Sequence, residues 1–318
     1  MSPRTKSSTQ GSDLSTTASI SDTSSSSFTS YRDFSAQDIL EEIQRLQSQG
    51  IHYLGEKNLT SLCEFTYNNT LKGDVLVPKD MNTNDSLQEF ILTGVFQIDG
   101  RNFFMTSDGK WNPNNPIGTR FDQAKGICHI SSVQRDPEFS IFSNDFPSLI
   151  NNLRAIEHLT NPRKSPETNS VIIGDSSGIK LTHHLFVVIP PFFLTTLHSF
   201  FFLKEKNQDL DSDLTNSSDI SIEDWPVQPS NQPYLDEIKN SHNVQQIPAY
   251  DIRGDPIHPL QYEEKLAGAI VRVCFTMVHY LIKQKHIYNA IPHDITVLRP
   301  PTKISSPKTS LKRILHNK

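Results

Sequence analysis

The sequence predicts a mainly β protein of the α+β class: a small barrel-like or sandwich-like β core with two peripheral helices, disordered tails and an acidic insertion. One observation behind this prediction is a long apolar run from Ala269 to Ile282, followed by a polar break at Lys283–His286 and a second apolar run that ends at Leu298. Another is a series of short β-branched and aromatic runs from Asp74 onward, separated by Asp-Gly turn signals. Two segments show the periodicity of an amphipathic helix.

The composition limits how much of the chain can be packed. Hydrophobic residues make up 35% of the 318 residues, which is low for a globular protein. The net charge of −5 gives the chain as a whole no attraction for a polyanion, which weakens a nucleic-acid-binding hypothesis without excluding it. Cys63, Cys128 and Cys274 lie far apart with no CxxC spacing, so we expect buried thiols and an intracellular protein, nuclear or cytoplasmic.

The chain is expected to begin with a disordered Ser/Thr-rich tail at residues 1–34 and to continue with a β-rich core at 35–203. The first helix is predicted at 36–49, where Ser35 and Asp38 form a capping pattern and the apolar residues share one face. The second helix is predicted at 146–160, with Asp145 as its cap. Strands are expected at Asp74–Val77, Phe90–Ile98, Ile127–Ser132, Val171–Ile173 and Leu185–Ile189, with a two-residue hairpin turn at Asp99-Gly100.

The last third of the chain changes composition twice. Residues 204–246 carry many Asp and Glu among Ser, Asn, Gln and Pro, and predict an acidic disordered insertion. Residues 247–301 are too few to be stable alone, so we expect them to complete the β core begun near Asp74. Residues 302–318 form a basic tail.

One apolar segment, Leu185–Leu203, is nearly long enough to span a bilayer. It contains Pro190-Pro191 at its middle and several polar residues after them, so we expect a buried strand and a second core element there and no membrane association.

A basic and aromatic stretch supports the first functional hypothesis. Residues 101–135 combine positive charge with interleaved aromatic rings, which are the ingredients of a groove that stacks bases and follows phosphates. Alternation in Ala269–Ile282 places Arg272 and Tyr280 on one face and Val271, Val273, Phe275 and Met277 on the other. We therefore predict a non-enzymatic protein that binds single-stranded nucleic acid or another protein. The predicted contacts are Arg101, Phe103, Lys110, Trp111, Arg120, Arg272 and Tyr280; Phe104, Lys125 and Arg135 lie in the same stretch.

The alternative hypothesis is a serine esterase. Gly174-Asp175-Ser176 and Asp255-Pro256-Ile257-His258-Pro259 resemble the first and last blocks of the SGNH (GDSL-type) hydrolase family, which implies Ser176 as nucleophile, His258 as base and Asp255 as its orienting carboxylate. Against it stand the β-rich region before the serine motif and the lack of a clear Asn block between the motifs. The adjacent His183 and His184 point in different directions, so we predict no metal site and no cofactor.

A second resemblance concerns residues 249–301. It is carried by Tyr250-Asp251-Ile252-Arg253-Gly254, Gly268-Ala269-Ile270-Val271-Arg272-Val273, Phe275-Thr276, His279-Tyr280 and Val297-Leu298-Arg299-Pro300-Pro301. On these residues the segment resembles an uncharacterised family of basidiomycete fungal proteins often found near mobile elements, which brings no known activity and implies a strand at 269–282. The layout of the segment is also typical of a small oligonucleotide-binding barrel. A third hypothesis is a protein-interaction module that acts through the acidic loop and the tails.

Overall fold

The structure, a computed structural model, describes residues 34–80, 88–115, 120–134, 136–160, 167–174, 177–189 and 220–302. All of them belong to one compact unit, Arg32–Lys318. Apart from Phe34 and Thr302, the two predicted tails lie outside the described residues, as do residues 204–219 of the predicted acidic insertion.

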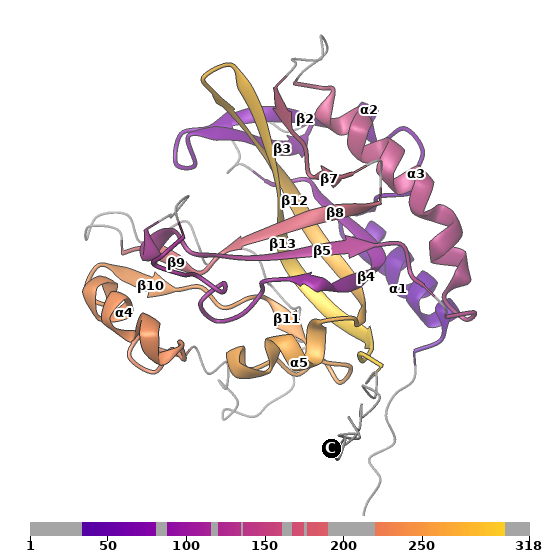
Figure 1. Ribbon diagram of the computed structural model, residues 1–318. Helices are drawn as coiled ribbons and strands as arrows, with labels where there is room; N and C mark the ends of the chain where they lie inside the picture. Colours follow the sequence, from indigo (N-terminus) through magenta and orange to yellow (C-terminus); the bar gives the residue numbers. More distant parts are fainter. Residues whose placement is uncertain are drawn as a thin grey trace, which may run out of the picture. The chain divides into compact units, whose positions relative to one another are not determined.

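Five strands close into a barrel: β4 (Ile91–Phe103), β5 (Lys125–Ser131), β8 (Gly178–His184), β12 (Ile270–Ile282) and β13 (Lys285–Arg299). They are hydrogen-bonded in the order β4-β5-β8-β13-β12, and β12 pairs back onto β4. Neighbours are antiparallel except β8 and β13, which run parallel. This arrangement confirms the mainly β prediction (Figure 1).

Shorter strands extend the barrel sheet to 11 strands. β2 and β3 form a hairpin whose β3 strand pairs with β12, and β9 and β10 form a separate two-stranded sheet. The bounds of these strands are β1 Ile51–Tyr53, β2 Cys63–Asn68, β3 Gly73–Pro78, β6 Thr168–Asn169, β7 Ile172–Ile173, β9 Phe186–Val188, β10 His242–Val244 and β11 Ala249–Tyr250.

The two predicted helices are present. α1 (Ala36–Ser48) has the predicted capping box between Ser35 and Asp38, and it buries Ile39, Ile43 and Leu46. α3 (Ser140–Glu157) begins six residues before its predicted start, because Phe142 and Phe146 continue its buried face toward the N-terminus. Asp145 is therefore no cap; its carboxylate accepts a hydrogen bond from the Tyr53 hydroxyl at 3.0 Å. The shorter helices are α2 Leu59–Leu62, α4 Gln232–Ile238 and α5 Tyr262–Leu266, with 3₁₀ turns η1 Phe121–Gln123, η2 Pro229–Asn231 and η3 Pro259–Gln261.

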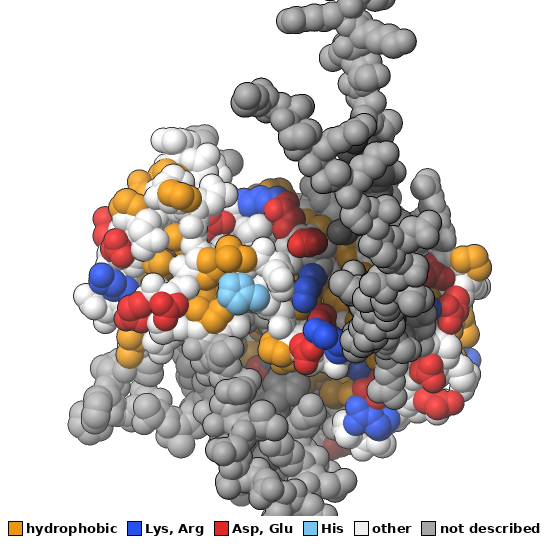
Figure 2. Space-filling model, turned by 90° about the horizontal axis from the view of Figure 1, so that it is seen from below, with side chains coloured by type: hydrophobic (Ala, Val, Ile, Leu, Met, Phe, Trp, Pro, Cys, Tyr) orange, Lys and Arg blue, Asp and Glu red, His pale blue; other side chains and the backbone are white. Residues whose placement is uncertain are grey.

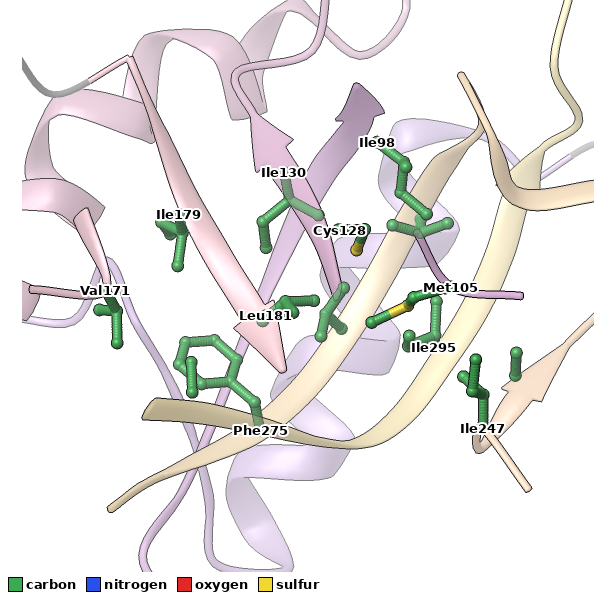
Figure 3. Packing of buried hydrophobic residues seen from close by; sticks show 14 of the residues in the cluster. Ile98, Met105, Cys128, Ile130, Val171, Ile179, Leu181, Ile247, Phe275 and Ile295 are labelled. Atoms are coloured by element: carbon green, nitrogen blue, oxygen red, sulfur yellow. The ribbon is translucent and has the colours of Figure 1, made fainter. Parts of the chain in front are cut away.

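The barrel interior is filled by apolar side chains from all five strands. Val271, Val273, Phe275 and Met277 are fully buried in it, which confirms the predicted inner face of β12. Figure 3 shows Cys128 and Ile130 of β5, Ile179 and Leu181 of β8 and Phe275 of β12 converging on this core.

The predicted hairpin turn at Asp99-Gly100 is wrong. β4 continues through these residues, and its pairing with β5 jumps from Ile98↔Ile130 to Phe103↔Cys128. A span of five residues on β4 is therefore paired with a span of two residues on β5, so β4 contains a large bulge. The Asp99 carboxylate stabilises the bulge, because its Oδ1 accepts a hydrogen bond from the Arg101 N–H at 2.9 Å. The chain reverses later, in the loop between β4 and β5, where Gly109 has φ +61 and a Cβ would lie 2.4 Å from the Lys125 carbonyl oxygen.

Residues 220–246, predicted as part of the disordered insertion, are folded. Ile222, Trp225, Leu235 and Ile238 are buried in the main core. The Trp225 indole Nε1–H donates to the Ser107 carbonyl oxygen at 2.7 Å, which fixes this segment on the β4–β5 loop. The prediction of disorder rested on the acidic composition of 204–246 as a whole. A few apolar residues within it are enough to pack residues 220–246 against the core.

The segment proposed as a membrane candidate begins as core. Leu185 is fully buried, and Phe186–Val188 form β9, which pairs with β10. Residues 190–203 lie outside the described part. Within the described residues, no helix is long and apolar enough to cross a membrane.

Candidate nucleic-acid interface

The outer surface of two neighbouring barrel strands gathers basic side chains. β5 and β8 pair antiparallel, with Lys125 opposite His184, Ile127 opposite Thr182 and His129 opposite Lys180. Because side chains alternate along a strand, the residues between them point into the barrel and are buried. These two strands run side by side across the middle of Figure 1. We call the outward set the β5–β8 face: Lys125, Ile127, His129, Lys180, Thr182 and His184. Thr182 in this set is buried, and the other five are partly or fully exposed.

The β5–β8 face contains two lysines, two histidines and no carboxylate. Partial burial and then the charge of Lys180 lower the pKa of Lys125. Burial also lowers the pKa of His129, while the Asp99 carboxylate at the margin opposes this shift and Lys180 adds to it. Lys180 thus contributes to the lowered pKa of both Lys125 and His129, and a phosphate bound on this face would offset that contribution. By contrast, acidic and basic side chains are interspersed with hydrophobic ones on the face seen in Figure 2, the side on which α5 lies.

An exposed aromatic ring borders this face. Phe104 is 41% exposed, and its N–H donates to the Ile127 carbonyl oxygen at 2.7 Å. The Lys110 ammonium lies 5.6 Å from the centre of the Phe104 ring and also pairs with Glu263 at 2.9 Å. Phe104 therefore presents a flat apolar surface beside the charged groups, which is the arrangement that stacks a nucleobase.

Three of the seven predicted contacts lie near this face and are accessible. Arg101 projects from the β4 bulge with a side chain that is 93% exposed. Arg120 is 77% exposed and pairs with Asp122 at 2.9 Å. Lys110 lies over Phe104 as described above. Of the further residues of the basic stretch, Lys125 belongs to the β5–β8 face and Arg135 is outside the described residues.

Three other predicted contacts pack or form ion pairs within the fold and are not part of the interface. Phe103 is 2% exposed and points into the barrel. Trp111 packs edge-on against Phe121 and Tyr234, and joins the β4–β5 loop to α4.

Arg272 is the third of these. Its guanidinium donates to Glu42 at 2.7 Å, and to Asp294 and Thr296 at 3.0 Å each. It therefore ties α1 to the barrel, and its side chain is only 13% exposed.

The seventh predicted contact, Tyr280, lies away from the β5–β8 face. Its ring covers Gly73 of β3, where an added Cβ would lie 2.6 Å from the ring. This close approach needs glycine at that position. Burial raises the pKa of the Tyr280 hydroxyl.

Sequence reasoning missed His129, Lys180 and His184. A partial signal for them exists in the segments KGICHIS (125–131) and GIKLTHH (178–184), which alternate between polar and apolar residues at Cys128–Ser131 and at Ile179–Thr182. Nothing in the sequence shows that the two strands are neighbours, because about fifty residues separate them.

The predicted esterase residues show no catalytic arrangement among the described atoms. Asp255 pairs with Arg253 at 3.0 Å, and the His258 Nδ1 accepts a hydrogen bond from the Leu260 N–H at 3.3 Å. Ser176 lies outside the described residues. The hydrolase interpretation needs a long helix after His258, and the chain forms the short α5 followed by strand β12 instead.

The described residues contain no group of three or more His, Cys, Asp or Glu that could hold a metal ion. All three cysteines are free and buried, as predicted. Burial raises the pKa of the Cys63 and Cys274 thiols to about 11, so these are not thiolates at neutral pH.

Comparisons with known proteins add little. No family model matches the chain, and no curated protein matches it. Among solved structures, the chain is similar to gp2.5, a single-stranded DNA binding protein encoded by bacteriophage T7, with a TM-score of 0.33 and 10% identity over 68% of this chain and 96% of that chain. The TM-score is too low for this likeness to support an argument.

Proposed function

We propose that this protein binds single-stranded nucleic acid on the β5–β8 face. The observation that carries the proposal is that Lys125 and Lys180 lie on a face that has no carboxylate among its own residues, and that the exposed Phe104 ring borders this face. In this arrangement the lysines neutralise phosphates and Phe104 stacks on a base. Because neither contact distinguishes one base from another, binding is expected to depend weakly on sequence and strongly on salt.

The barrel topology supports the same proposal by analogy. An oligonucleotide-binding barrel has five strands, and its ligand lies across the second and third of them. In this barrel the second and third strands in chain order are β5 and β8. The analogy concerns the fold, so the function depends on the residues of the face.

The lysines allow a quantitative test. Alanine at both Lys125 and Lys180 removes two phosphate contacts, so the slope of log affinity against log salt should decrease by about 1.4, or about 0.7 per contact. The measurement is fluorescence anisotropy with a labelled oligothymidylate of about 20 nucleotides, which exceeds the length usually covered by one such barrel.

The matched control is alanine at Lys57 and Lys239, which are both exposed and lie outside the β5–β8 face. The control should keep the wild-type slope. An unchanged slope in the Lys125/Lys180 variant, or an equal loss in the control, would contradict the proposal.

Two other hypotheses stay as predictions. The resemblance of residues 249–301 to the fungal family adds no activity to the proposal. Interaction through the acidic loop concerns residues 204–219 and the tails, which lie outside the described part. An intracellular location, nuclear or cytoplasmic, agrees with the proposed ligand.

A further inference from the structure

Two hairpin tips lie side by side at one end of the sheet. β3 pairs with β12 at Asp74↔His279, and the Tyr280 ring covers Gly73, so the β2–β3 turn lies against the end of β12. We call these tips, Tyr67–Gly73 and Tyr280–Ile287, the arm. Figure 1 shows the β12–β13 hairpin projecting at the top, with β2 and β3 beside it.

The arm reaches beyond the closed barrel. Phe275 is the last residue of β12 that pairs with β4, and Ile282 is seven residues further along. At about 3.3 Å per residue, this ribbon extends roughly 23 Å. Lys283 and Gln284 form its turn with positive φ angles of 49° and 68°, a geometry that matches the twist of the strands.

Exposed hydrophobic side chains gather on the arm. Leu281 is 63% exposed and Ile282 is 52% exposed, while Tyr67 and Leu71 on the neighbouring tip are 57% and 40% exposed. The Leu71 turn is held in place because the Asn68 carboxamide oxygen accepts hydrogen bonds from the Thr70 and Leu71 N–H groups. Single exposed hydrophobic residues are common, but four on two adjacent rigid turns indicate a contact surface.

The charge of the arm selects the kind of partner. Its two segments contain Lys72, Lys283 and Lys285 and no Asp or Glu. The Asp74 carboxylate, which follows the first segment, is engaged by His279 Nδ1 at 2.7 Å. Glu167 lies beside the second segment, where its carbonyl oxygen accepts a hydrogen bond from the His286 N–H at 3.1 Å. Two copies joined through their arms would bring lysines of like charge together, so the charge favours a polyanion over a second copy of this chain.

We infer that the arm binds the duplex end of a junction between double-stranded and single-stranded nucleic acid, and that Leu281 and Ile282 insert between base pairs there. Aliphatic side chains act as wedges of this kind when flanking lysines hold the phosphates. The junction as substrate class rests on the proposed function, because the β5–β8 face would hold the single-stranded side.

The test compares three labelled probes with the full-length protein: a single strand, a blunt duplex, and a duplex with a single-stranded extension. A 2-aminopurine base at the junction reports unstacking by an increase in fluorescence. Wild-type protein should bind the junction about 10-fold more tightly than the single strand and should increase this fluorescence. Serine at Leu281 and Ile282 should remove both effects and leave single-strand affinity unchanged.

The control variant is Leu260→Ser, because Leu260 is 72% exposed and lies outside the arm. It should behave as wild type, and equal melting temperatures should show that all variants fold. The inference would be overturned if the wild type showed no preference for the junction, or if the Leu281/Ile282 variant kept that preference. It would also be overturned if the wild type formed a dimer that this variant lost, because the arm would then bind a second copy of the chain. A junction effect that depends on Leu281 and Ile282, together with no binding to the single strand, would support the arm and refute the β5–β8 proposal.

Discussion

Alanine substitutions at two adjacent phenylalanines should separate the residues that stabilise the fold from those that bind nucleic acid. Phe103 is 2% exposed inside the barrel, and Phe104 is 41% exposed beside the β5–β8 face. Phe103→Ala leaves a cavity in the core and should lower the free energy of unfolding by about 3–5 kcal/mol. Phe104→Ala removes a partly exposed ring and should lower it by about 1 kcal/mol or less. Urea denaturation followed by fluorescence measures both values.

The expected effects on binding are reversed. A stacked base contributes about 1–3 kcal/mol, so Phe104→Ala should raise the Kd for oligothymidylate by about 5-fold to 150-fold. Phe104→Tyr keeps a ring of the same shape and should keep most of the affinity. Phe103→Ala, measured at a temperature where it is folded, should bind as wild type. The reasoning is refuted if Phe104→Ala binds normally, or if folded Phe103→Ala loses affinity and Phe104→Ala does not.

Two further predictions concern buried charge. Arg272→Ala leaves the Asp294 carboxylate without its cationic partner and should destabilise the fold by about 3–5 kcal/mol in urea denaturation. The salt slope of oligonucleotide binding should stay unchanged, and a reduced slope would restore Arg272 as a contact. Burial lowers the pKa of His183 to about 4, while its Nε2–H donates to the Gln245 carbonyl oxygen. Because the unfolded chain takes up this proton near pH 6.5 and the folded protein does not, the stability that His183 contributes is present above pH 6.5 and is lost as the pH falls toward 4. His183→Gln should flatten that part of the stability curve, and an unchanged curve would contradict the assignment.

The strands near the C-terminus were predictable because each has its own local signal. β12 and β13 are long apolar runs separated by a polar break, so the existence of both strands and the inner face of β12 follow from the sequence. Closure of the barrel was not predictable in this way. It depends on β12 pairing with β4, for example Phe275 with Leu92, across more than half of the chain.

The site was predicted only in part, and the bulge in β4 explains the main error. Ile98 points into the barrel, so regular alternation would place Phe103 outside and Phe104 inside. The bulge between Ile98 and Phe103 shifts the alternation by one residue, so Phe103 points into the barrel and Phe104 points outward. No local residue pattern distinguishes such a bulge from the tight turn that Asp99-Gly100 predicts, because Asp and Gly favour both.

The net charge of −5 pointed away from a polyanionic ligand, and the local distribution of charge explains why this argument is weak. At physiological salt, exposed charges more than about 8 Å apart are largely screened from one another. A bound phosphate therefore interacts with the lysines that it touches and very little with acids elsewhere on the chain. The β5–β8 face and the arm each contain lysines and no Asp or Glu among their own residues. The relevant quantity is the charge within one screening length of each phosphate, and the fold determines it by placing Lys125 and Lys180 on one face of the paired strands β5 and β8.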